Sequence, residues 1–193
     1  MTALRSFQCA AALFVAVVVL ATGSAAQGVD VRFTALAVNM GSPWPSGTAT
    51  VDIGVDRWST DNERQRLFDV LRERGPDSLL TTLQDLPRVG SIRTPNAIGY
   101  PLHFAQRIPD GDGGERVVLA TDRYISFWEA ANRPRTIDYP FTIIDIRIGS
   151  DGQGQGKMSL ATKVSLSIDG KTIELENFAT QPVRLTSVRR TER

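Results

Sequence analysis

Histidine and cysteine are nearly absent from this sequence, which holds one of each, His103 and Cys9, in 193 residues. Zinc and copper sites are built mainly from these two residue types, and a typical zinc site uses about three or four protein ligands. A single histidine is too few for a site of this kind. We therefore predict no zinc or copper centre, and no motif for another cofactor is present.

Charge is scarce at the beginning of the chain. Arg5 is the only charged residue among the first 26, and it is followed by an unbroken apolar run over 10–20 and then by small residues up to Ala26. These are the three parts of a secretory signal peptide. The apolar run is shorter than the roughly 20 residues that span a bilayer. We predict a signal peptide over 1–26 and a mature domain over 27–193 without a membrane anchor.

Removal of this segment leaves no cysteine, which excludes disulfide bonds and thiolate catalysis in the mature domain. It also leaves 21 basic and 21 acidic residues. A neutral chain exerts no long-range attraction on polyanions, and no basic stripe of the kind found in nucleic-acid-binding proteins is visible. We predict a single domain exported by the Sec-type pathway, periplasmic or extracellular, that binds no nucleic acid.

Two strands and a helix pair are predicted in the first half. Apolar and polar residues alternate over 48–58, as in a half-buried strand, and 29–40 is rich in β-branched and apolar residues. Thr60 with Glu63 is a capping-box pair and predicts the start of a helix over 61–74. Leucines at helical spacing predict a second helix over 77–86, which ends before a proline.

The remaining chain is dominated by β patterns separated by turn signals. Glycine-rich runs at 110–114 and 149–156 and an Asp-Gly pair at 169–170 are typical of turns and hairpins. The predicted strands are 98–108, 115–121, 124–129, 139–148, 157–168, 171–178 and 182–188. Strands that follow one another and are joined by short hairpins form an antiparallel meander. We predict about nine strands in a closed or nearly closed barrel, or in a two-layer sandwich, with the helix pair inserted after the second strand.

In element order, this chain resembles lipid-binding barrels in which a helix pair caps one mouth. Folds of this type commonly enclose a cavity, no catalytic motif is present, and reactive residue types are scarce in the mature domain, so we predict a non-enzymatic protein that binds a small apolar ligand in or beside its barrel. Aromatic side chains at a barrel mouth bind flat ligands, and aromatic side chains in a β core fill it. The predicted ligand contacts are Trp44, Trp58, Trp128, Leu80 and Leu83, with the leucines on the inner side of a helical lid.

Two other functions are compatible with the sequence. A small barrel enzyme, an isomerase or a hydrolase, would use His103 or an inward carboxylate such as Asp145 as its base, with Arg147 or Tyr100 as electrostatic support. A structural or protein-interaction module would have no cavity. No catalytic motif is present.

Calcium needs only oxygen ligands, which Asp110, Asp112 and Glu115 carry. Their spacing does not match an EF-hand, and the run is better explained as a hairpin loop.

Overall fold

The computed structural model describes residues 28–38, 48–75, 77–94, 98–122, 142–160, 163–166, 173–176 and 183–192. In chain order the elements are β1 (Gly28–Val38), β2 (Thr48–Arg57), α1 (Asp61–Arg74), α2 (Asp77–Asp85), β3 (Gly90–Arg93), β4 (Tyr100–Leu102), β5 (Phe104–Pro109), β6 (Glu115–Thr121), β7 (Thr142–Ile148), β8 (Gln153–Leu160), β9 (Lys163–Leu166), β10 (Ile173–Glu176) and β11 (Val183–Glu192). The signal peptide, the strand predicted at 124–129, Trp44 and Trp128 lie outside the described residues.

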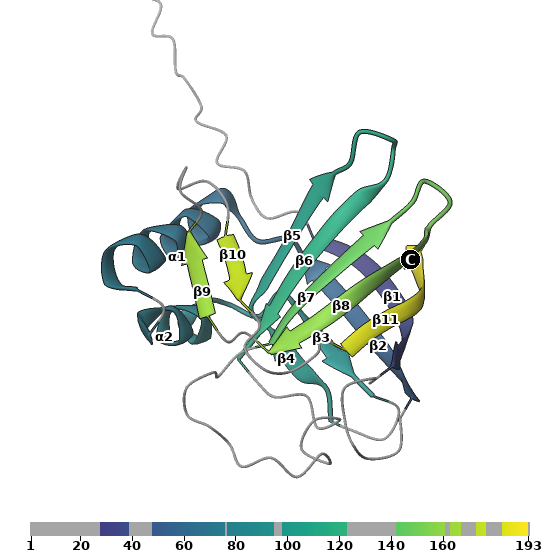
Figure 1. Ribbon diagram of the computed structural model, residues 1–193, viewed down its shortest axis with the longest axis horizontal. Helices are drawn as coiled ribbons and strands as arrows, with labels where there is room; N and C mark the ends of the chain where they lie inside the picture. Colours follow the sequence, from purple (N-terminus) through teal and green to yellow (C-terminus); the bar gives the residue numbers. More distant parts are fainter. Residues whose placement is uncertain are drawn as a thin grey trace, which may run out of the picture.

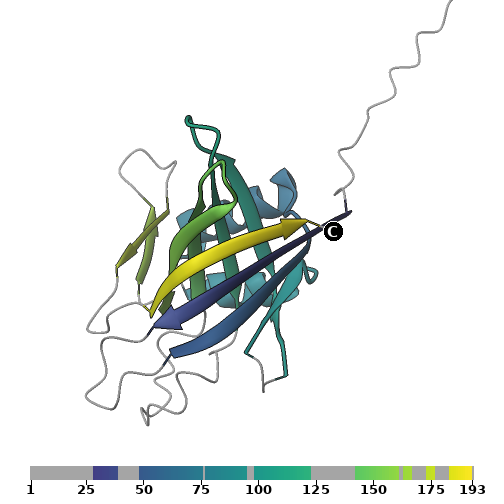
Figure 2. The same cartoon turned by 90° about the vertical axis from the view of Figure 1, so that its right-hand side faces the viewer.

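Nine strands form one curved sheet in the order β4-β3-β2-β1-β11-β8-β7-β6-β5, with antiparallel neighbours throughout, and β9 pairs with β10 in a separate hairpin (Figure 1). In the view turned by 90°, β11, β1 and β2 cross the wall side by side, and the helices lie behind (Figure 2). Among the described residues, neither α1 nor α2 has the length and hydropathy of a transmembrane segment.

The sheet curls until its two edges nearly meet at His103. The edge strands β4 and β5 are separated in the chain by this one residue. His103 N donates to Ala120 O (3.0 Å), while Ser59 N donates to Ala105 O (2.8 Å) from the other side. The predicted fold is therefore confirmed as a nearly closed antiparallel barrel with the helix pair after the second strand.

Apolar side chains fill the barrel interior in the described strands. Alternate residues of each strand point inward, and Phe33, Ile53 and Ile144 are at most 1% exposed. They belong to one continuous cluster to which β1–β8 and β11 contribute, with Val29, Trp58 and Tyr100 packed against it. Burial of apolar surface on this scale is the main stabilising term of the fold. The described part of the barrel is therefore a packed core.

The helix pair lies against the outer wall of the barrel. Ala120 and Ile143 alternate with core residues of β6 and β7, pair with each other across the strands and face outward. The second apolar cluster consists of Leu67, Leu71, Leu79, Leu83, Leu86 and Ala120, with Leu80, Phe104 and Ile143 half-buried against it. The helices thus pack at one end of these strands, on Phe104 of β5, Ala120 of β6 and Ile143 of β7.

Several predicted boundaries in the β region were wrong. The predicted strand 98–108 is broken at His103, β3 was not predicted, and 157–168 is divided between β8 and β9. The predicted glycine-rich loop also ends early, because β8 begins at Gln153. A Cβ on Gly154 would lie 2.0 Å from Arg147 O on β7. Glycine is required there by close approach of two strands, which the sequence alone does not distinguish from a turn.

A bulge in β11 sets which of its side chains face inward. The register shifts between Leu185 and Val188, and Ser187 has φ 51°, in the left-handed region. The extra residue changes the alternation, as a bulge does. Val188 is consequently buried in the core, and Arg190 reaches the inner side of the barrel, where it pairs with Glu115.

Candidate functional site

A small pocket lies beside the barrel where β2 leads into α1. Its volume is about 230 Å³, and its lining residues, together called the Trp58 pocket, are Trp58, Ser59, Asp61, Arg64, Phe104, Gln106 and Arg107. Ser59 Oγ accepts a hydrogen bond from Ala105 N (3.0 Å). This bond, with the reverse backbone bond from Ser59 N, joins the β2–α1 connection to β5.

The start of α1 fixes one side of the pocket. Thr60 Oγ1 accepts from Glu63 N (3.2 Å), and Glu63 Oε2 accepts from Thr60 N (2.8 Å), which is the predicted capping box. Arg57 donates two hydrogen bonds to the Glu63 carboxylate, at 2.8 and 2.9 Å. These bonds lower the pKa of Glu63 below its ordinary value. The first turn of α1, which carries Asp61 and Arg64, is thereby held against β2.

Two aromatic side chains line the pocket and remain half-buried. Trp58 packs against the barrel core, and Phe104 packs against the helix cluster. Each therefore has a packed part that orients the ring and an accessible part in the pocket. In the described part of the chain the Trp58 indole N–H and the Gln106 amide have no hydrogen-bond partner. The pocket thus combines accessible aromatic surface with polar side chains.

A buried carboxylate, that of Glu115, contacts Arg107, one of the residues that line the pocket. Glu115 faces inward, its side chain is 5% exposed, and it forms ion pairs with Arg107 and Arg190. The Arg190 side chain is 15% exposed, whereas that of Arg107 is 49% exposed and also lines the Trp58 pocket. Buried charges require such partners. Glu115 thus holds Arg107 at the pocket and is not an exposed calcium ligand; no group of three or more metal-ligating side chains occurs among the described residues.

His103 stands at the junction of β4 and β5 and is oriented by two neighbours. Its Nδ1 lies 2.9 Å from Leu86 O, and because a carbonyl only accepts, Nδ1 is the donor. Nε2 lies 3.6 Å from Asp122 Oδ1, and both side chains are mostly buried. Gln84 Nε2 donates to the other Asp122 oxygen (3.2 Å). In the described residues no hydroxyl or thiol is hydrogen-bonded to His103.

Asp145 faces away from the barrel interior. It alternates with the buried Ile144 and Ile146 and accepts two hydrogen bonds from Arg116, at 2.9 and 3.0 Å. This contact raises the pKa of Arg116. The prediction of an inward carboxylate at this position was therefore wrong, because the alternation of β7 turns Asp145 outward. Arg147, which was predicted to give electrostatic support to this base, is exposed.

The other predicted contacts are divided between two packing environments. Tyr100 packs against the barrel core, and Leu80 and Leu83 belong to the helix cluster on the outer wall. The two leucines therefore do not line the barrel interior. Of the predicted aromatic contacts, Trp58 is the one in the described residues, and it lines a pocket. The sequence analysis did not identify Phe104, Arg64 or Arg107 as pocket residues. No local motif indicates that these residues, which lie apart in the sequence, come together in the fold.

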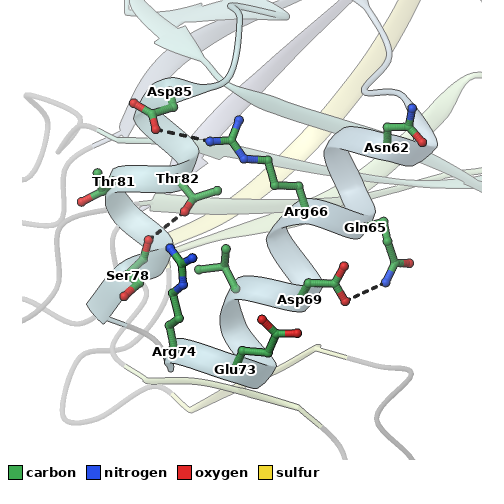
Figure 3. Close-up of a pocket in the computed structure, with 11 residues that line it drawn as sticks. Asn62, Gln65, Arg66, Asp69, Glu73, Arg74, Ser78, Thr81, Thr82 and Asp85 are labelled. Carbon is green, nitrogen blue, oxygen red and sulfur yellow. Dashed lines mark hydrogen bonds and ion pairs between the residues drawn. The ribbon is translucent and has the colours of Figure 1, made fainter.

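A second, larger depression runs between the exposed faces of α1 and α2 (Figure 3). Its volume is about 830 Å³, and it is lined by Asn62, Gln65, Arg66, Asp69, Val70, Glu73, Arg74, Ser78, Thr81, Thr82 and Asp85. Many of these groups bind one another: Arg66 pairs with Asp85 (3.4 Å), and Gln65 donates to Asp69 (3.0 Å). The groove contains no aromatic side chain, and Val70 is its one aliphatic residue among polar and charged ones.

Comparisons were made with protein-family models, curated proteins and solved structures. None of the three gives a match to this chain. Function is therefore inferred from the geometry of its own residues.

Proposed function

We propose that this chain is an exported, non-enzymatic binding protein that holds a small ligand with a flat apolar face beside its barrel, in the Trp58 pocket. The observation that carries the proposal is the pair of half-buried aromatic side chains, Trp58 and Phe104, lining a pocket whose walls also carry polar side chains such as Gln106. Ligand sites in proteins combine apolar and aromatic walls with a few polar groups in this way.

The size of the pocket limits the ligand. At about 230 Å³, the pocket is smaller than the roughly 300–1000 Å³ of sites for drug-sized molecules. A compact ring system fits this space, whereas a long lipid chain does not. The packed interior of the described strands supports a site beside the barrel in preference to one inside it.

An enzyme that uses His103 is the second candidate, favoured by the orientation of this ring between Leu86 O and Asp122. His103 does not line the Trp58 pocket. The two candidates therefore make opposite predictions for substitutions at the two positions.

The test is a fluorescence titration of the mature domain, residues 27–193, with the neutral dye N-phenyl-1-naphthylamine. Loss of an aromatic contact face should cost on the order of 1.4 kcal/mol, or about tenfold in Kd. We expect Trp58→Ala to weaken dye binding at least about tenfold, and His103→Gln to leave it unchanged. Equal affinities of the wild type and Trp58→Ala would refute the proposal, and loss in His103→Gln alone would favour the second candidate.

A further inference from the structure

We infer that the ligand of the Trp58 pocket carries an anionic oxyacid group, a carboxylate, sulfonate or phosphate, which Arg107 and Arg64 bind; this inference rests on the proposed function. Both arginines line the pocket together with Trp58 and Phe104. The inference specifies the chemistry of the ligand, a flat apolar body with one negative group, and identifies the residues that select it.

Arg107 has unused hydrogen-bonding capacity at the pocket. Its ion pair with the buried Glu115 is made through Nε, and within the described residues the guanidinium has no other polar partner. A guanidinium has five N–H donors in a planar fork that matches the oxygens of an oxyacid. The remaining donors of Arg107, whose side chain is 49% exposed, are available to a bound anion.

The positive charge of Arg107 is only partly neutralised. Glu115 pairs with Arg190 as well, so one carboxylate faces two guanidinium groups. The Arg107 side chain is 49% exposed and that of Arg190 is 15% exposed, so Arg107 carries the more accessible of the two charges, and it lies at the pocket.

Arg64 adds a second positive group from the first turn of α1. Its ion pair with Asp61 (2.9 Å) involves a carboxylate whose side chain is 93% exposed. A pair of this kind is screened by water and is worth little. An anion placed near Arg64 and Arg107 competes readily with Asp61. The lining residues therefore favour a ligand with a negative group next to its ring.

The test compares two dyes that share a phenylnaphthylamine body. N-phenyl-1-naphthylamine is neutral, and 1-anilinonaphthalene-8-sulfonate adds one sulfonate. We expect Arg107→Gln to reduce the affinity ratio of the anionic to the neutral dye by about tenfold. Arg64→Gln should reduce the ratio by a smaller factor. Arg72→Gln, an exposed arginine of α1 outside the pocket, is the matched control and should leave the ratio unchanged.

The outcomes separate this inference from the function on which it rests. If both dyes need Trp58 but the ratio is the same in wild type, Arg107→Gln and Arg64→Gln, the anionic ligand is refuted and the binding function stands. If the Kd of neither dye depends on Trp58, both the anionic ligand and the binding function are refuted. Arg64→Gln changes only a helix-surface residue, so it supplies the answer even if Arg107→Gln does not fold. Sodium chloride should lower the affinity ratio of the anionic to the neutral dye in the wild type and have little effect on it in a variant that combines Arg107→Gln with Arg64→Gln.

Discussion

Arg190→Met should destabilise the barrel by about 2–3 kcal/mol. Removing one partner of a buried ion pair costs about 3–5 kcal/mol, because the other charge is left in a poorly solvated place. Here the stranded charge would be Glu115, whose side chain is 5% exposed. Arg107 remains as its second partner and is partly exposed to water, which lowers the expected cost. Urea unfolding followed by far-UV circular dichroism measures this change.

The same reasoning predicts a rescue. In the Arg190→Met background, Glu115→Leu removes the stranded carboxylate, and replacement of a buried pair by apolar residues is often neutral or stabilising. The double variant should therefore lie within about 1 kcal/mol of the wild type. Arg189→Met, at the exposed neighbouring position of β11, is the matched control and should change stability by less than about 0.5 kcal/mol. Equal stabilities of Arg190→Met and Arg189→Met would refute the buried pair.

Three further predictions concern the helix start, the strand packing and export. Because Arg57 lowers the pKa of Glu63 below its ordinary value of 4.5, the stabilisation from Glu63 is full above that pH and is lost as pH falls through the folded-state value. Glu63→Gln should therefore cost about 1–2 kcal/mol at pH 7, and acid titration of unfolding should show the difference from wild type narrowing below pH 4.5. Gly156→Ala should destabilise by more than about 2 kcal/mol in urea unfolding, because the new Cβ would lie 2.6 Å from Asp145 O; an unchanged midpoint would contradict this packing. Protein recovered from the exported fraction of a bacterial host should begin at Gln27 by N-terminal sequencing, and an uncleaved N-terminus there would contradict the signal peptide.

Local signals were sufficient for much of the fold. Alternation predicted β2, and the capping-box pair Thr60 and Glu63 predicted the start of α1, because the interactions behind these features span only a few residues. The order of strands and helices then limited the topology to a meander. These features depend on short-range chemistry that can be recognised in the sequence itself.

The features that were missed depend on long-range register. The pairing of Glu115 with Arg190 joins residues 75 positions apart, and it requires the bulge at Ser187 to turn Arg190 inward. Serine is not a residue type that marks a left-handed position in advance. The Trp58 pocket was missed for the same reason, since Phe104 and Arg107 reach it only because β5 packs against the β2–α1 connection.

The location of the bound ligand tests the central claim most directly. The chain has three tryptophans, so a ¹⁵N-labelled mature domain has three indole N–H signals, and Trp58→Phe identifies that of Trp58. During titration with 1-anilinonaphthalene-8-sulfonate, this signal should shift saturably with the Kd obtained by fluorescence, while the amides of core residues such as Ile144 remain in place. Saturable shifts in the core residues without any at Trp58 would place the ligand inside the barrel and contradict the account.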